Sequence, residues 1–162
     1  MKRLALTILP LALLAAFAYW WFLPAQVLKR RTQRILHTLT LKAGATRTSR
    51  QLGIYSLNAL LSSAVQLDTP TLPDANGTFD RSEVESAFSW LCDQAIQSHF
   101  ELAEFHAVTI DGDQADVAFA IDALVELPSS RPVEGRYEVT FRWQLENDAW
   151  YLTRANWVAG GR

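Results

Sequence analysis

Two side chains in the second half of the chain have the chemistry of a general acid or base. Asp122 stands in an otherwise apolar run from Ala118 to Leu124, where a carboxylate could serve as a base. His106 lies in an alternating stretch and could exchange a proton near neutral pH. The same alternation places Asp122 on the solvent face of a strand, and an exposed or structural histidine is the simpler interpretation of His106. Asp122 and His106 are our catalytic candidates, yet we expect a non-catalytic domain.

A second group of residues could bind a ligand rather than react with it. Arg154 and Asn156 share the alternation of Trp150, Leu152 and Val158 in the last predicted strand, so they could orient a ligand inside a pocket. The alternative is that the two polar side chains satisfy each other at a rim while the aromatic residues fill the core. The candidate ligand-binding residues are Tyr55, Trp90, Trp143, Arg154 and Asn156.

Metal, nucleotide and thiol chemistry find little support in the sequence. Only His99 and Glu101 have a spacing that could share a metal, and two ligands are too few. The sequence contains no nucleophile elbow, P-loop or dinucleotide fingerprint. The single Cys92 excludes an intrachain disulfide and has the spacing of a buried thiol. We therefore expect neither a metal nor a cofactor.

Three amphipathic helices are expected to precede a sheet. Apolar residues from Val27 to Leu41 indicate a first helix that ends near Gly44, and a second helix is expected over 48–67. The segment 68–78, with two prolines and an Asn-Gly pair, reads as a loop. A third helix begins at an S-x-x-E capping box, Ser82 and Glu85, and ends near residue 98.

From there onward the period of the apolar residues changes to two. Asp111-Gly112 and Asn147-Asp148 are turn signals that join antiparallel strands. These patterns predict an α+β fold in which three helices cover one side of a curved antiparallel sheet of about four strands. The expected strands are residues 100–110, 114–127, 136–146 and 150–158.

The first 25 residues form a separate unit. Lys2 and Arg3 precede an uncharged stretch, residues 4–23, whose length as a helix is about 30 Å, the thickness of a bilayer core. Aromatic residues from Tyr19 to Phe22 at its far end suit the lipid headgroup level. We expect a signal anchor over 1–25, which contacts the bilayer, and one globular domain over 26–162.

The alternative for this segment is a signal peptide cleaved at Ala16-Phe17-Ala18. Cleavage there would leave an apolar start on a soluble protein, so we favour the anchor. Basic residues flank the stretch on both sides, which weakens the positive-inside rule. A short basic start before an apolar segment is the usual export layout, and it favours a periplasmic domain on the bacterial inner membrane.

Charge is distributed unevenly along the rest of the chain. Seven basic residues and no acidic ones lie between Pro24 and Leu67, whereas the chain from Asp68 onward has six basic and seventeen acidic residues. Basic side chains directly after a span are suited to anionic lipid. The acidic character of the whole excludes a nucleic-acid partner. The expected membrane-surface residues are Lys29, Arg30, Arg31 and Arg34.

The order of elements resembles the nuclear transport factor 2-like superfamily, the cone-shaped fold also found in SnoaL-like cyclases. The run Tyr137 to Leu152, with its polar turn followed by Trp150, is similar to the last hairpin of that family, and Asp111 to Ala115 is similar to the preceding one. The similarity covers about Gln26 to Val158 and is greatest to bacterial membrane-anchored members. No catalytic residue of a family enzyme maps onto this sequence.

The resemblance implies a cone that either holds a ligand or is filled by its aromatic residues. We expect a membrane-anchored, non-catalytic ligand-binding or protein-interaction module of the bacterial envelope. The alternative is a small isomerase, dehydratase or cyclase acting on an apolar substrate. Relatives also pair through the outer face of the sheet, which implies a homodimer as a further expectation, supported if that face carries an apolar patch.

Overall fold

The computed structural model describes residues 19–44, 46–69, 76–128 and 131–160. Most of the predicted membrane span, residues 4–23, and the whole Ala16-Phe17-Ala18 cleavage signal fall outside these ranges, so both remain predictions. Within the described ranges, no helix combines the length and the apolar character that crossing a bilayer requires.

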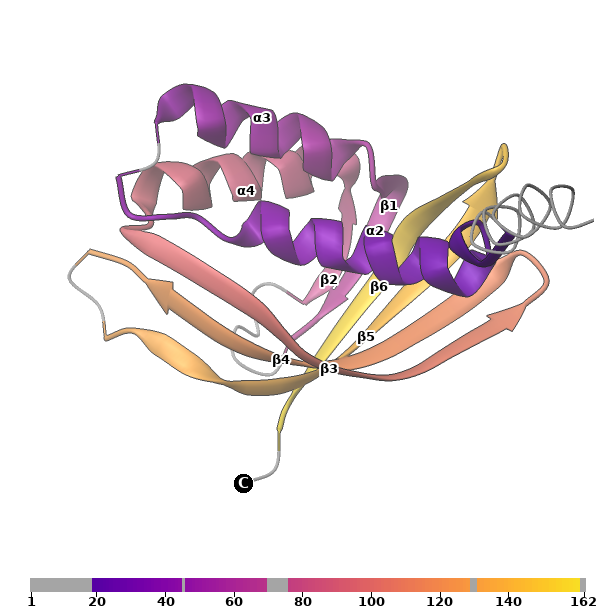
Figure 1. Ribbon diagram of the computed structural model, residues 1–162. Helices are drawn as coiled ribbons and strands as arrows, with labels where there is room; N and C mark the ends of the chain where they lie inside the picture. The colour runs from indigo at the N-terminus through magenta and orange to yellow at the C-terminus, as the bar shows by residue number, and fades with distance from the viewer. Residues whose placement is uncertain (1–18, 45, 70–75, 129–130, 161–162) are drawn as a thin grey trace, which may run out of the picture.

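Helices occupy one side of a single twisted sheet in the described residues (Figure 1). The sheet has the strand order β2-β1-β6-β5-β4-β3, and every neighbouring pair is antiparallel except β1 with β6. The elements are α2 (Pro24–Leu39), α3 (Arg47–Asn58), β1 (Leu61–Asp68), β2 (Gly77–Asp80), α4 (Arg81–Gln94), β3 (Gln97–Asp111), β4 (Gln114–Glu126), β5 (Val133–Glu146) and β6 (Ala149–Ala159).

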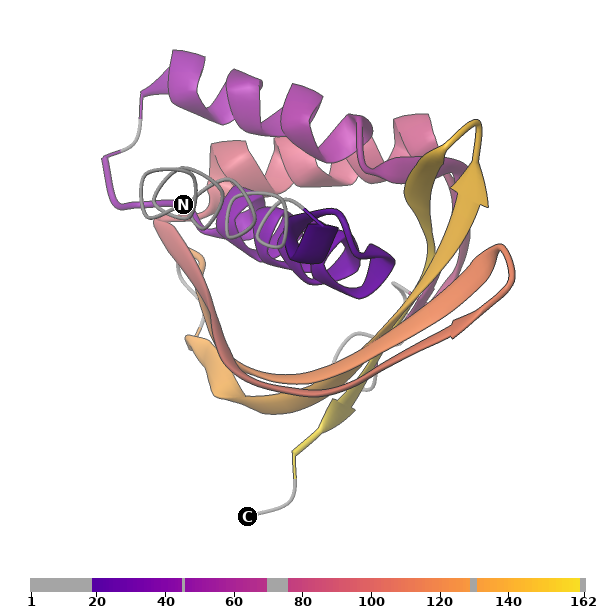
Figure 2. The ribbon, with the colours of Figure 1, turned by 45° about the vertical axis from the view of Figure 1, so that its right-hand side comes forward.

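The sheet curves into a trough that holds α2, as Figure 2 shows from one end. Helix α2 buries Leu28, Ile35 and Leu36 against the concave face. Facing them from the strands are fully buried side chains such as Phe119 and Trp143. Helices α3 and α4 lie over the open side of the trough, so the core sits between α2 and the strands (Figure 2).

Irregular pairing accompanies the bend of the sheet. The register between β3 and β4 shifts between Leu102 and Glu104 and again between Phe105 and Ala107. The register between β5 and β6 shifts once, where Thr153 is inserted. Extra residues of this kind bend a strand and increase its twist, which converts a flat sheet into a cone wall. Each one also reverses which side chains face the core.

The prediction of about four strands was wrong, because the sheet has six in the described residues. The predicted second helix ends at Asn58, and residues 61–68 of the same apolar run form β1 instead. A short apolar run fits a period of two as well as a helical stripe. Its pairing with β6, more than 80 residues away, decides the outcome, and a distant partner leaves no local signal.

The predicted loop over 68–78 contains the start of β2, which pairs antiparallel with β1. The capping box of the third helix was also misplaced. Helix α4 begins slightly earlier, with Asp80 rather than Ser82 as N-cap, and the backbone N–H of Asp80 donates to the Glu83 carboxylate at 2.8 Å. The predicted box residue Glu85 instead accepts a hydrogen bond from Asn58 at 2.7 Å.

The four carboxy-terminal strands are confirmed, with bounds within three residues of those expected. Both turns are confirmed as well. Gly112 has φ +60°, and Asn147 and Asp148 have φ +49° and +63°. Positive φ at both central residues is typical of the two-residue hairpin turn that matches strand twist.

Candidate functional site

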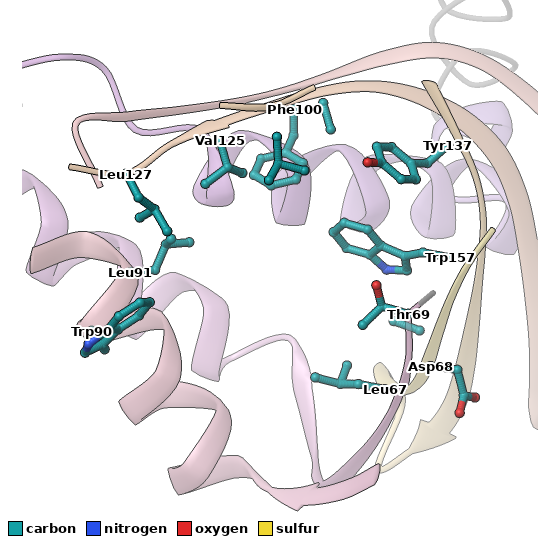
Figure 3. A pocket seen from close by; sticks show the side chains of 13 residues that line it. Leu67, Asp68, Thr69, Trp90, Leu91, Phe100, Val125, Leu127, Tyr137 and Trp157 are labelled. Atoms are coloured by element: carbon teal, nitrogen blue, oxygen red, sulfur yellow. The ribbon is translucent and has the colours of Figure 1, made fainter. Parts of the chain in front are cut away.

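A cavity of about 360 Å³ opens between α4 and the ends of five strands, β1, β3, β4, β5 and β6 (Figure 3). The sheet forms one wall through the end of β4 and the start of β5, and β1 and β6 close the side opposite α4. Helix α2 enters the trough from the other end, near the β3–β4 and β5–β6 hairpins (Figure 1). The lining comprises Leu67, Asp68, Thr69, Trp90, Leu91, Phe100, Ala123, Val125, Leu127, Val133, Tyr137, Ala155 and Trp157.

Aromatic rings and small residues together create the space. Trp157 packs edge-on against Phe100 at 5.9 Å between ring centroids, and Tyr137 lies 6.4 Å from Trp157. Between these rings the strands carry small residues, since Ala123 of β4 pairs with Gly135 of β5. Large rings at the sides and small residues at the base leave a hollow that no side chain of the described residues fills.

Polar groups are few in the described lining. Asp68 is directed away from the hollow in Figure 3, and its carboxylate accepts hydrogen bonds from Arg154. The backbone N–H of Thr69 donates to the Asn76 side chain at 2.6 Å. The Tyr137 hydroxyl is the one titratable group of the described lining that is not held in an ion pair. The cavity is thus suited to an apolar ligand.

Comparison with solved structures shows which fold this chain shares with known proteins. No protein-family model matches the sequence, and no curated protein is significantly similar to it. A nuclear transport factor 2-like protein from Salmonella enterica serovar Typhimurium has a similar structure, with a TM-score of 0.66, 11% identity and coverage of 85% of this chain and 92% of the other. The fold is that of the nuclear transport factor 2-like proteins.

Other structures with this fold include candidate enzymes. A candidate dehydratase of the same family from Streptomyces avermitilis has a TM-score of 0.63 at 15% identity, over 85% of this chain and 96% of the other. A candidate scytalone dehydratase from Novosphingobium aromaticivorans has a TM-score of 0.65 at 10% identity, over 84% and 83%. At such identities the similarity shows the nuclear transport factor 2-like cone alone, as the sequence resemblance implied.

Of the predicted ligand-binding residues, Trp90 lines the cavity, although 58% of its surface is exposed at the mouth. Tyr55 lies on α3 with 72% of its surface exposed and is not part of the lining. Trp143 is wholly buried beneath α2, away from the cavity, and its indole nitrogen has no hydrogen-bond partner in the described residues. The structure therefore does not bring these three aromatic residues together.

The expected inward face of Arg154 and Asn156 was wrong, because the bulge at Thr153 reverses the alternation. Leu152 pairs with Trp143 on the core face, but after the bulge Arg154 pairs with Arg142 on the outer face. Ala155 and Trp157 point inward instead. Sequence reasoning missed Trp157 for this reason, since a one-residue insertion shifts every later side chain to the other face.

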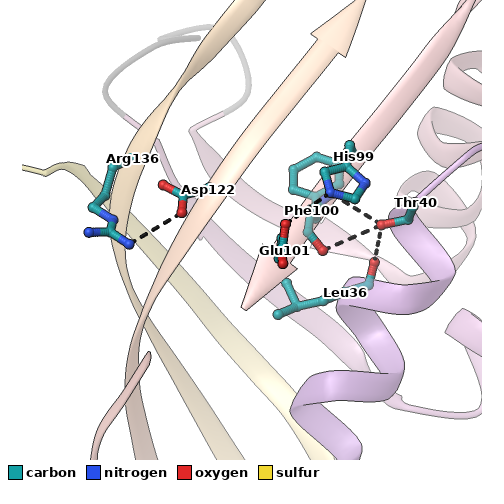
Figure 4. Close-up of polar contacts among 7 residues, drawn as sticks. All are labelled: Leu36, Thr40, His99, Phe100, Glu101, Asp122 and Arg136. Carbon is teal, nitrogen blue, oxygen red and sulfur yellow. Dashed lines mark hydrogen bonds and ion pairs between the residues drawn. The ribbon is translucent and has the colours of Figure 1, made fainter. Parts of the chain in front are cut away.

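The catalytic candidates lie on the outer, convex face of the cone. Asp122 is exposed and paired with Arg136, at 3.2 Å between Oδ2 and Nη2 (Figure 4). His106 stands at one of the β3 bulges, and its Nε2 lies 2.8 Å from the Glu138 carboxylate. Neither side chain faces the cavity, so the geometry offers neither of them a buried substrate.

Ion pairs connect side chains of different strands on the outer face of the sheet. Arg142 donates to both oxygens of Asp116 at 2.8 and 2.9 Å, which raises the pKa of the Arg142 guanidinium. Similar contacts join neighbouring strands at Asp122 and Asp68, and His106 of β3 reaches across β4 to Glu138 of β5. These pairs place charge on the outer face where a homodimer would need an apolar patch, and that partner stays a prediction.

The described residues are not arranged for metal binding or for thiol chemistry. No group of three histidine, cysteine or acidic side chains there could hold a metal ion. His99 contacts Glu101 at 3.3 Å, and no third ligand joins them in the described ranges (Figure 4). Cys92 is buried in α4, and burial raises the pKa of its thiol, so the reactive thiolate is disfavoured.

The predicted membrane-surface cations have different surroundings. Arg31 donates to the carbonyl of Trp150, and burial lowers the pKa of its guanidinium. Lys29 lies over the Phe105 ring, 5.2 Å from its centroid. Arg30 stacks on Trp21 at 4.1 Å and donates to its carbonyl. Arg31 is therefore part of the fold, Lys29 and Arg30 are half-buried like it, and Arg34 is exposed.

Proposed function

We propose that this domain binds an apolar small molecule in the cone and carries out no chemistry on it. The single observation that supports the proposal is the cavity of about 360 Å³ with its nearly apolar lining. Ligand pockets are commonly about 300–1,000 Å³ and combine apolar walls with a few polar groups. We further propose that residues 4–23 tether the domain to the bacterial inner membrane, with the domain on the periplasmic side.

Binding without catalysis is favoured by the chemistry of the described lining. Asp68 and Tyr137 are its titratable members, and the Asp68 carboxylate is directed outward and paired with Arg154 at 2.7 Å. General acid–base catalysis needs a proton donor or acceptor within reach of the substrate. An isomerase or dehydratase reaction would have to proceed with Tyr137 alone, so we rank the enzyme as the alternative.

The exposed aromatic residues before α2 support the tether. Tyr19 and Phe22 are 75% and 73% exposed, and Trp20 and Trp21 are about half exposed. Aromatic side chains of this kind are enriched where a span meets the headgroups. Because α2 enters the trough at the end opposite the cavity (Figure 1), a tether there would leave the cavity free. The binding and anchoring ends of the domain would then be separate.

The six tryptophans provide a position-specific test of ligand binding. The full chain, with its indole nitrogens labelled with ¹⁵N, would be titrated in micelles with the uncharged probe N-phenyl-1-naphthylamine. We expect saturable shifts of the Trp157 and Trp90 indole signals, since both rings line the cavity. The Trp143 signal should stay unchanged because that ring lies in the core.

A matched pair of substitutions completes the test. Ala123→Phe adds a ring to the cavity wall, whereas Ala107→Phe adds the same ring to the exposed outer face of β3. We expect Ala123→Phe to abolish the saturable shifts and Ala107→Phe to preserve them. Equal binding by both variants, or shifts of all six indoles without saturation, would contradict a ligand site in the cone.

A further inference from the structure

The Tyr137 hydroxyl has no protein partner among the described residues, and its oxygen is accessible rather than fully buried. Only 8% of the surface of Tyr137 is exposed, and its side chain lines the cavity. No hydrogen bond joins its hydroxyl to any residue in the described part of the chain. A buried hydroxyl that loses water without gaining another partner destabilises the complex. A ligand that fills the cavity must therefore supply that partner or leave the hydroxyl unpaired.

Small residues leave the approach to this hydroxyl open. A Cβ built on Gly135 would lie 3.8 Å from the Tyr137 hydroxyl oxygen, so the hydroxyl lies over a residue that has no side chain. Ala123, another lining residue, pairs with Gly135 on the neighbouring strand. The Tyr137 ring also lies beside Trp157, 6.4 Å away between ring centroids (Figure 3). The hydroxyl thus lies beside the empty volume.

The described lining also excludes one kind of ligand by its charge. It contains no lysine, arginine or histidine, and the nearby Arg154 points to the outer face and is paired with Asp68. An anionic ligand would lose its hydration there without gaining a counter-charge, which costs far more than burying a neutral oxygen. A carboxylate or phosphate headgroup is therefore poorly suited to the interior of the cavity.

We infer that the ligand is an uncharged, largely apolar molecule that carries one hydrogen-bonding oxygen, and that this oxygen pairs with the Tyr137 hydroxyl. The inference rests on the proposed function, because it assigns the polar contact of the same cavity. The hydroxyl donates to a carbonyl or ester oxygen, or exchanges a hydrogen bond with an alcohol. Tyr137 is a ligand-binding residue in this account, and no bond is made or broken.

Two probes of nearly the same shape test the inference. 2-Acetylnaphthalene carries a carbonyl oxygen where 2-ethylnaphthalene has hydrogen atoms, and the Trp157 indole signal of the full chain reports the binding of each. We expect Tyr137→Phe to weaken binding of the ketone about three- to tenfold relative to the hydrocarbon, the range for one neutral hydrogen bond. Comparing the ratio of the two dissociation constants between wild type and Tyr137→Phe cancels the difference in solubility between the probes.

Two controls test whether the effect is specific to the Tyr137 hydroxyl and whether the cavity excludes a charged ligand. Tyr55→Phe removes a hydroxyl from an exposed ring outside the cavity and should leave the ratio unchanged. 2-Naphthoate, the charged analogue, should bind at least about tenfold more weakly than the ketone. If the wild type binds both neutral probes and Tyr137→Phe leaves their ratio unchanged, the hydroxyl contact is refuted. If neither neutral probe shifts Trp157, the proposed function itself has failed.

Discussion

Arg154 holds the Asp68 carboxylate on the outside of the cone. Its Nη2 and Nε atoms lie 2.7 and 2.9 Å from the same Oδ2 atom. The pair spans the parallel contact between β1 and β6, so it also fixes the edge of the cavity wall. With both charges directed outward, the interior retains its neutral character.

Removing this contact should affect stability more than binding. Both side chains are more than a third exposed, and ion pairs of this kind contribute about 0–1 kcal/mol. We expect Arg154→Gln to lower the free energy of unfolding in urea by no more than about 1 kcal/mol. Probe binding at Trp157 should be unchanged, and a large loss of binding would show that Arg154 contributes to the site.

The outer-face candidates provide a test of the enzyme alternative. Asp122 and His106 are each paired on the convex side, away from the cavity. We expect Asp122→Asn and His106→Gln to leave the dissociation constant of N-phenyl-1-naphthylamine within about twofold, less than one neutral hydrogen bond contributes. Titration of both variants beside the wild type measures this. A tenfold change in either variant would contradict the assigned orientation.

The packing of α2 should dominate the stability of the domain. Leu28 is completely buried between α2 and the sheet, so Leu28→Ala should cost about 2–5 kcal/mol, as expected for a buried leucine whose removal leaves a cavity. Arg34→Ala on the exposed face of the same helix is the matched control and should stay within about 0.5 kcal/mol. Urea unfolding of both variants gives the comparison. Similar losses would mean that α2 does not pack as described.

Cys92 should make stability depend on pH in the alkaline range. Burial raises the pKa of the folded thiol above its ordinary value of 9.0, so the folded state keeps its proton while the unfolded state loses it. The resulting stability is complete below about pH 9 and is lost as the pH rises beyond that value. A thiol reagent at pH 8 should therefore label the native chain much more slowly than the urea-unfolded chain. Immediate labelling of the native chain would contradict the burial.

The membrane tether has its own test. We expect the full chain to stay with the membrane fraction after an alkaline carbonate wash. Leu13→Arg together with Leu14→Arg should release it, since each arginine at the centre of a span costs about 2.5–3.5 kcal/mol. Leu52→Arg, on the exposed face of α3, should leave the protein in the membrane fraction. Extraction of the wild type would refute the anchor.

Much of the cone could be predicted from the sequence because its four long strands follow local alternation and end at turns that contain Gly112 or Asn147. Strand β1 could not, since its pairing with β6 depends on residues far along the chain. The site was only partly predictable. Trp90 was found from its residue type, but the bulge at Thr153 placed Trp157 inward and Arg154 outward. One inserted residue has no reliable signal in an alternating pattern.

The most direct test of the central claim is a crystal structure of the full chain in detergent with 2-acetylnaphthalene. The account predicts density for the naphthalene ring between Trp90 and Trp157, with the ketone oxygen about 2.6–3.0 Å from the Tyr137 hydroxyl. A cavity that stays empty at saturating ligand, or that is filled by the protein's own side chains, would contradict it.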